Sequence, residues 1–199
     1  WTAPSATTSL AFGLGVGGCS AFMSFGLYLG LRAPMVRYPW PAPPAARRGG
    51  PCVYAGSFNP PHNGHLEIVR YLAATHSKVY MVIGVNPTKR YLVDPHVRRE
   101  LAQRMLSELG GTENVEVRVV AGYVWRFGFE MGAERLYRGL RSWGKDGREE
   151  KTLEALNTIG PLLLGRRLPL PTTYIQANPQ WAFISSTLLR ECVQKDEGV

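Results

Sequence analysis

The 199 residues are enough for one ordinary domain with a hydrophobic core and one appendage. Hydrophobic residues make up 45% of the chain and charged residues 19%, a balance that excludes an intrinsically disordered protein. The net charge of +8 favours an acidic partner: a nucleotide, an anionic lipid or a nucleic acid. No nucleic-acid-binding module or basic-aromatic repeat accompanies that charge, so we expect no nucleic acid partner.

The amino-terminal part is apolar. Residues 1–8 form an uncharged tail, and residues 9–31 form an uncharged run that ends before Arg32. A helix of about 20 residues spans about 30 Å, the thickness of the hydrocarbon core, so we predict one transmembrane helix over 9–31. A buried globular helix is the alternative. A first residue of Trp1 rather than Met leads us to expect a processed precursor or a further leader.

Charges and small residues around this run suggest an orientation and a partner. Arginines follow the run at positions 32, 37, 47 and 48, and positive charge stays on the cytoplasmic or matrix side. We therefore predict an organellar membrane, the mitochondrial inner membrane, with the domain on the matrix side. Gly13, Gly17 and Ala21 form a small-residue face that would let helices of other membrane subunits approach. Simple tolerance of glycine in membrane spans explains that spacing nearly as well.

Residues 32–50 are rich in Pro, Ala and Gly and predict an extended linker before a domain over 51–199. Within that domain, apolar runs predict five strands, over 52–54, 78–85, 115–120, 135–137 and 171–177. Amphipathic segments between and after them predict helices that begin at 66 or cover 94–109, 123–132, 149–158 and 186–195. The alternation predicts an α/β fold, a Rossmann-like five-stranded parallel sheet with helices on both faces.

Two of these helices have clear apolar positions. The first should bury Leu66, Val69, Leu72 and Ala73. The second should bury Val97, Leu101 and Met105. The cysteines at 19, 52 and 192 are isolated and odd in number, so neither a disulfide framework nor a metal site is predicted.

The segment between the first strand and its helix, 54–65, reads Tyr-Ala-Gly-Ser-Phe-Asn-Pro-Pro-His-Asn-Gly-His. Gly56 would let the backbone approach a ligand closely, because no Cβ intervenes. His62 and His65 are three residues apart, so both imidazoles can face one side of the opening helical turn. That turn's N–H groups and dipole favour a bound phosphate. Two surface histidines on an ordinary strand-turn-helix are the alternative.

Three further segments also follow predicted strands, so they should meet the first at the sheet's carboxyl edge. They are Asn-Pro-Thr-Lys-Arg at 86–90, Arg-Gly-Leu-Arg at 138–141 and Trp-Ala-Phe-Ile-Ser-Ser-Thr at 181–187. Each has a simpler explanation by itself. Lys89 with Arg90, and Arg138 with Arg141, could be solvated charges, and Ser185 could only cap a helix.

Together, in this order and from about 51 to about 195, the four segments resemble the nucleotidyltransferase superfamily. Within it they are most similar to the bacterial-type phosphopantetheine adenylyltransferases. The resemblance implies transfer of AMP from ATP to 4′-phosphopantetheine, giving dephospho-CoA and pyrophosphate in coenzyme A biosynthesis. It also implies Mg²⁺ bound through the triphosphate, and coenzyme A or dephospho-CoA as a further ligand. The acceptor phosphate is already ionised, so alignment and charge neutralisation suffice without a general base.

The same resemblance assigns roles to individual residues. Catalytic roles fall to Ser57 near the reacting phosphates, His65 on the α-phosphate, Lys89 on the transition state and Arg138 on the ATP or acceptor phosphates. Binding roles fall to Gly56, Phe58, His62, Gly64, Arg141, Glu150, Ser185, Ser186 and Thr187. Among these, the two serines would hold the β- and γ-phosphates, and Glu150 the ribose.

Three functions remain open at this point. The intact motifs favour a membrane-anchored adenylyltransferase acting on phosphopantetheine. The glycine-spaced apolar run favours an enzyme-derived accessory subunit of an organellar inner-membrane complex that keeps a nucleotide pocket. A nicotinamide or nicotinate mononucleotide adenylyltransferase is the third, because Ser-Phe-Asn-Pro at 57–60 and Ile-Ser-Ser-Thr at 184–187 also suit that family.

Overall fold

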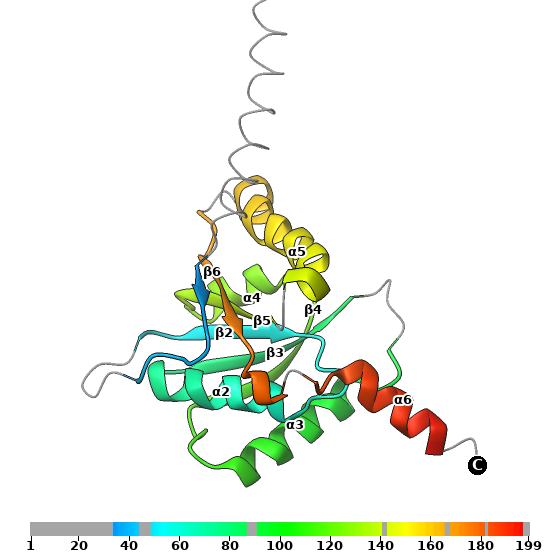
Figure 1. Ribbon diagram of the computed structural model, residues 1–199. Helices are drawn as coiled ribbons and strands as arrows, with labels where there is room; N and C mark the ends of the chain where they lie inside the picture. Colours follow the sequence, from blue (N-terminus) through cyan, green and yellow to red (C-terminus); the bar gives the residue numbers. More distant parts are fainter. Residues whose placement is uncertain are drawn as a thin grey trace, which may run out of the picture.

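The computed structural model describes residues 34–43, 49–86, 91–140, 143–165, 168–181 and 183–196 (Figure 1). These residues form one parallel sheet in the order β1-β6-β5-β2-β3-β4. The strands are β1 (Met35–Val36), β2 (Cys52–Gly56), β3 (Val79–Val85), β4 (Val115–Ala121), β5 (Arg135–Leu140) and β6 (Thr172–Gln176). The helices are α2 (Asn63–Thr75), α3 (Pro95–Leu109), α4 (Val124–Glu130), α5 (Trp143–Leu164), the 3-10 helix η1 (Pro179–Trp181) and α6 (Ser186–Asp196).

Helices cover both faces of the sheet, with α2 and α3 on one side and α4 and α5 on the other (Figure 1). Side chains of a strand point alternately to its two faces, and β2 shows this directly. Cys52 and Tyr54 are buried in the cluster beneath α2 and α3. Val53 and Ala55 are buried with Trp125 of α4. The predicted Rossmann-like α/β fold with helices on both faces is therefore confirmed.

The predicted number of five strands is wrong, because a sixth strand comes from the segment assigned to the linker. Met35–Val36 pairs in parallel with β6, and the backbone N–H of Tyr174 donates to the carbonyl of Pro34 (2.9 Å). The proline-rich sequence around these two residues gives no strand signal. The open edge of β6 supplies the unpaired backbone groups that make them a strand.

Trp40 holds the same segment to the domain. Its indole Nε1 donates to the carbonyl of Gln176 (2.9 Å), and its ring packs on Tyr71 of α2 with the centroids 4.9 Å apart. Trp40 therefore joins the end of β6 to α2, and residues 34–40 are fixed to the sheet at two points.

Burial on α2 follows the prediction, because Leu66, Val69, Leu72 and Ala73 are all buried. The predicted face of α3 is wrong, since Val97 and Leu101 are exposed and Met105 is only partly buried against the core. The buried residues of α3 are Arg98, Ala102 and Leu106. The helix is thus rotated by one position from the apolar pattern. Its inner face begins with an arginine that is bonded to the turn after β2, as described below.

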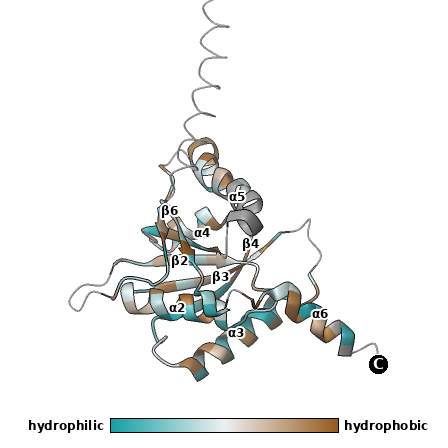
Figure 2. Cartoon of the chain, in the orientation of Figure 1, coloured by the Kyte–Doolittle hydropathy of each residue, from teal (hydrophilic) through white to brown (hydrophobic). Residues whose placement is uncertain are grey.

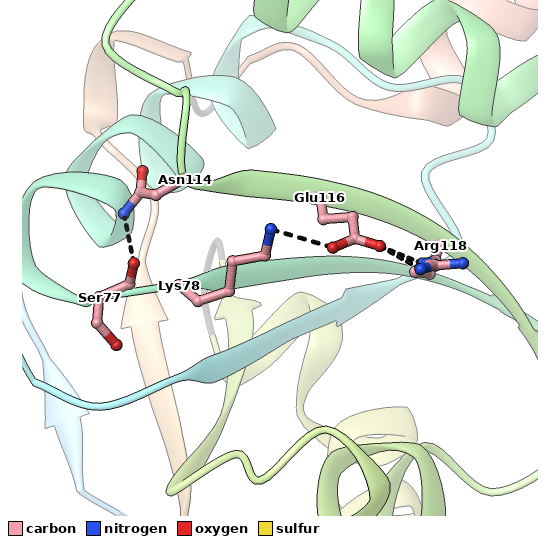
Figure 3. A network of polar contacts seen from close by, with 5 residues as sticks. All are labelled: Ser77, Lys78, Asn114, Glu116 and Arg118. Atoms are coloured by element: carbon pink, nitrogen blue, oxygen red, sulfur yellow. Dashed lines mark hydrogen bonds and ion pairs between the residues drawn. The ribbon is translucent and has the colours of Figure 1, made fainter.

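The outer edge of the sheet is polar (Figure 3). Glu116 of β4 lies between Lys78 (Nζ–Oε2 3.0 Å) and Arg118, and the hydrogen bond from Lys78 is the main reason that the pKa of Glu116 is lowered. Asn114 Nδ2 donates to the carbonyl of Ser77 (3.4 Å) and to that of Ala73 (3.0 Å), and the second bond ties the start of β4 to the end of α2. Charged side chains on an edge strand discourage pairing with another chain.

Within the described residues, no helix has both the length and the hydropathy needed to cross a membrane. The predicted transmembrane helix over 9–31 lies outside these residues and stays a prediction.

Candidate active site

The strand order reverses between β2 and β5, because β3 and β4 extend the sheet on one side of β2 and β5 and β6 on the other. In parallel α/β sheets, ligands bind in the crevice beyond the carboxyl ends of the strands at such a reversal. Arg138 of β5 crosses this point and donates from Nη1 to the carbonyl of Ala55 in β2 (2.9 Å). Ser57, which follows β2, is exposed at the same edge.

Phe58 shapes the turn that follows β2. Its φ of 43° is in the left-handed region, and its side chain is 2% exposed. The ring packs between Tyr54 (centroids 5.3 Å apart) and His65 (4.9 Å). A Cβ on Gly56 would lie 2.8 Å from this ring, so glycine is required there by the phenylalanine. A strained residue of this kind persists only where its surroundings hold it, and here it leaves Ser57 at the surface.

The two histidines of the motif begin α2 and fix each other's orientation. The backbone N–H of His62 donates to Nδ1 of His65 (3.3 Å), and the two rings stack with their centroids 3.6 Å apart. A neutral imidazole that accepts at Nδ1 carries its proton on Nε2. The local fold therefore selects the tautomer of His65 whose Nε2–H can donate to a phosphate oxygen.

The amino terminus of α6 is attached to the turn after β2. The hydroxyl of Ser186 donates to the carbonyl of Pro60 (2.8 Å). Arg190 donates from Nη1 to the carbonyl of Asn59 (2.5 Å) and from Nη2 to Oγ1 of Thr187 (3.0 Å). These bonds bring the serine-rich segment of the sequence to the histidine motif, more than 100 residues away along the chain.

Gly64 permits a second close contact between the same two segments. A Cβ there would lie 3.2 Å from the His62 ring and 3.2 Å from Cβ of Trp181. The glycine of the histidine motif thus leaves room for the 3-10 helix before α6.

The two serines of this segment have different hydrogen-bonding capacity. Ser185 is the N-cap of α6 and accepts from the backbone N–H of Leu188 (3.1 Å), so this bond leaves its own O–H as a donor. Ser186 uses its O–H on Pro60 and retains only acceptor capacity. Phosphate oxygens are acceptors, so Ser185 suits a phosphate and Ser186 suits holding the turn.

Arg98 is a site residue that the sequence analysis missed. Its guanidinium is fully buried, donates to the carbonyl of Ser57 and lies over the ring of Tyr91 (4.4 Å to the centroid). The hydroxyl of Tyr91 accepts from the backbone N–H of Asn86 (3.0 Å). Burial is the main cause that lowers the pKa of Arg98. The available signal was the spacing of Arg98 with Ala102 and Leu106, which puts the arginine on the buried helix face.

The same contacts locate the ends of the loop between β3 and α3. Asn86 and Tyr91 flank it, and the backbone N–H of Val93 donates to Oδ1 of Asn59 (3.3 Å). Both ends of the loop are therefore held close to the turn after β2. The predicted Lys89 and Arg141, and the side chain of Glu150, lie outside the described residues.

A second group of titratable residues lies at the opposite edge, where β2 and β3 begin. Nε2 of His76 lies 3.2 Å from the hydroxyl of Tyr137, and its Nδ1 lies 3.3 Å from the carbonyl of Leu72. Burial lowers the pKa of His76 and raises the pKa of Tyr137 to about 12. Burial also raises the pKa of the Cys52 thiol to about 12, so it is no nucleophile. These groups support the fold, away from the candidate active site.

In the described part of the chain, no three His, Cys, Asp or Glu side chains are grouped so as to hold a metal ion. The candidate site is instead a set of N–H and O–H donors around two helix amino termini. A parallel α/β sheet with this arrangement at its reversal point defines a nucleotide-binding protein of the Rossmann-like class.

Comparisons with known proteins agree with this class. Residues 53–192 match the family described as Cytidylyltransferase-like. The phosphopantetheine adenylyltransferase of Leuconostoc mesenteroides is 32% identical over 139 residues, which cover 70% of this chain and 79% of that protein. The enzyme of the same name from Haemophilus ducreyi is 34% identical over 140 residues, which cover 70% of this chain and 80% of that protein. The family match and these relatives show that the chain belongs to the cytidylyltransferase-like nucleotidyltransferases, in their phosphopantetheine adenylyltransferase type.

Several solved structures were also similar. One of them is the Plasmodium falciparum nicotinic acid mononucleotide adenylyltransferase complexed with NaAD, with a TM-score of 0.46 and 13% sequence identity. The overlay covers 72% of this chain and 83% of that one.

Proposed function

We propose that this protein transfers AMP from ATP to 4′-phosphopantetheine and releases dephospho-CoA and pyrophosphate. The observation that carries the proposal is the meeting of the histidine motif, Arg138 and the start of α6 at one sheet edge, held by direct hydrogen bonds. The acceptor is taken from the relatives, which are named phosphopantetheine adenylyltransferases.

In the proposed reaction, an oxygen of the acceptor phosphate attacks the α-phosphorus of ATP. A new P–O bond forms, the bond to the β-phosphate breaks, and pyrophosphate leaves with the electron pair. No proton has to move, so the protein contributes alignment and charge neutralisation. Nε2–H of His65 would donate to the α-phosphate, and O–H of Ser185 to the departing phosphates.

Arg138 would add positive charge beside those phosphates, and Lys89 would do so in the transition state. Mg²⁺ would enter with the triphosphate, whose oxygens are its ligands, and would supply further charge neutralisation.

We also propose that residues 9–31 anchor the protein in an organellar membrane, the mitochondrial inner membrane, with the domain on the matrix side. An uncharged run long enough to cross, followed by four arginines, supports this orientation. Gly13, Gly17 and Ala21 would face a helix of a partner subunit.

Pyrophosphate release tests the activity. The full chain in detergent should release pyrophosphate from ATP only when phosphopantetheine is present, and His65→Ala should lower the rate at least about tenfold. His96→Ala is the matched control, because it also replaces a histidine, and the His96 side chain is exposed on α3 and is not one of the residues assigned to the candidate active site. ATP binding by calorimetry without turnover on phosphopantetheine or on the mononucleotides would favour the accessory-subunit function instead.

Two measurements test the anchor. The protein should stay in the membrane fraction after carbonate extraction, and recovery in the soluble fraction would contradict the span. Gly13→Leu with Gly17→Leu should keep the protein in the membrane but release it from its complex on native gels. An unchanged assembly would argue against the small-residue contact.

A further inference from the structure

The carboxyl-terminal half of α5 presents apolar side chains outward. Leu156 and Ile159 are exposed, and Leu163 and Leu164 are 71% and 57% exposed. Leu168, four residues beyond the helix, is 82% exposed. We call these five residues the α5 outer patch, and Figure 2 shows hydrophobic colouring on these last turns of the helix.

The inner side of the same turns is built from small residues. A Cβ on Gly160 would lie 2.7 Å from Nε1 of Trp125, and one on Gly165 would lie 3.2 Å from the same ring. The large apolar side chains are therefore on the outside, the reverse of an ordinary surface helix. Single exposed leucines are common, but a contiguous group of this kind marks a surface that contacts something apolar.

The position of β1 determines how close the apolar run over 9–31 must lie to the domain. The carbonyl of Pro34 accepts from the backbone N–H of Tyr174, so Pro34 is fixed beside β6 at the start of β1. Leu31, the last residue of the apolar run, is only three residues earlier, a span of at most about 11 Å. If 9–31 crosses a bilayer, this edge of the domain is held close to the headgroups.

The α5 outer patch lies toward that same end of the molecule. In Figure 1 the carboxyl end of α5 and the starts of β1 and β6 point to the top, while α3 and α6 lie at the bottom. In the sequence, two arginines, at 166 and 167, stand between Gly165 and Leu168. Basic and apolar residues together suit an anionic lipid surface.

We propose that the α5 outer patch lies on the bilayer, with its apolar side chains at the boundary between headgroups and acyl chains. This inference rests on the proposed membrane anchor. Strands β1 and β6 then begin toward the membrane and run away from it, so the start of α6, which follows β6 and belongs to the candidate active site, lies on the aqueous side (Figure 1). A second copy of the chain, or another protein segment, is the competing occupant.

Site-specific fluorescence tests this arrangement on the full chain. Leu163→Cys is labelled with an environment-sensitive dye in a Cys19→Ser and Cys192→Ser background, because the remaining Cys52 is buried. Val97→Cys, on α3 and 51% exposed, is the matched control. Both proteins are placed in vesicles of three parts phosphatidylcholine to one part phosphatidylglycerol, with or without lipids that carry a nitroxide quencher. Circular dichroism confirms that each labelled protein is folded.

In vesicles, the emission of the dye at position 163 should shift to shorter wavelength. The nitroxide lipids should quench that emission at least about twofold more than the emission of the dye at position 97. A shift without quenching would show that protein covers the patch and would overturn the inference. Equal quenching at both positions, or none at either, would also overturn it. Carbonate extraction of the same vesicles separates the two proposals. Release of the protein contradicts the anchor and this inference together, whereas retention with an unquenched dye contradicts this inference alone.

Discussion

The buried guanidinium of Arg98 donates to the backbone carbonyl of Ser57, 41 residues earlier in the chain. A single residue of α3 therefore fixes the position of the turn after β2. The same guanidinium rests on Tyr91, whose hydroxyl holds the backbone of Asn86. Arg98 thus joins the turn that carries Ser57 to both ends of the loop that contains the predicted Lys89, and we expect it to position the two for the same phosphates.

Arg98→Met should weaken ATP binding, because the carbonyl of Ser57 loses its donor and the turn loses its support. The loss of a hydrogen bond from a charged group corresponds to about 1.5–3 kcal/mol, or about tenfold to a hundredfold in affinity. Arg98→Lys should recover part of the lost ATP affinity. Arg104→Met is the control, since Arg104 is exposed on the same helix and pairs with Glu108, which is also exposed. Calorimetry on proteins of matched circular dichroism measures the effect, and an affinity that matches the Arg104 variant would argue against the positioning role.

Ser185→Ala and Ser186→Ala should behave differently, although the residues are adjacent. Ser185→Ala removes a hydroxyl that can donate to phosphate, so we expect kcat to fall about tenfold or more. It also removes an N-cap, which costs about 1 kcal/mol of stability. Ser186→Ala removes the bond to Pro60 and should chiefly lower stability.

Steady-state pyrophosphate release and urea denaturation of both variants make the comparison. Ser185→Thr is the control for the capping effect, because it keeps the hydroxyl and the cap. If Ser186→Ala lowers kcat more than Ser185→Ala does, the assignment of the phosphate-binding serine is reversed.

Trp40→Ala should destabilise the domain although Trp40 lies outside the matched family region. Its half-buried ring loses the contact with Tyr71 and the bond to Gln176, so we expect a loss of about 2 kcal/mol in the free energy of unfolding. Trp40→Phe keeps the ring contact and should lose only about 1 kcal/mol. Urea denaturation of the full chain in detergent measures both. Equal stability of wild type and Trp40→Ala would mean that residues 34–40 do not contribute to the fold's stability.

His76 should make the protein less stable in mild acid. Burial lowers the pKa of His76 in the folded state, so the unfolded chain binds the proton more readily, and this contribution to stability is lost as pH falls through about 6.5 and below. Arg135 lowers this pKa further, while Glu134 and the bond to the carbonyl of Leu72 oppose the shift. His76→Gln should flatten the pH dependence of the unfolding midpoint. A wild-type midpoint that is constant between about pH 7.5 and about pH 5 would contradict the expectation.

The sequence alone determined the fold class and singled out the histidine motif, Arg138 and Ser185, which the fold brings to one sheet edge, but it missed Arg98. Apolar runs alternating with amphipathic segments identified all five strands over 52–177, because strand and helix periodicity are local properties. Gly56 is required for a local reason, because a Cβ there would lie 2.8 Å from the ring of Phe58, two residues later. Gly139 is required for a tertiary reason, because its Cβ would lie 2.7 Å from the hydroxyl of Tyr54.

Only the tertiary structure decided which residues meet. The two-residue strand β1 exists because β6 offers an open edge, and no periodicity can be detected in two residues. Arg98 is on the inner face of α3 because a carbonyl on another segment accepts its proton, whereas the apolar pattern favoured Val97 and Leu101. Ser185 and Ser186 cannot be distinguished in the sequence. In the structure the hydroxyl of Ser186 donates to the carbonyl of Pro60, whereas the hydroxyl of Ser185 caps α6 and can still donate to a ligand. The role of each hydrogen-bond donor thus depends on which acceptor the fold places beside it, and those acceptors lie far away in the sequence.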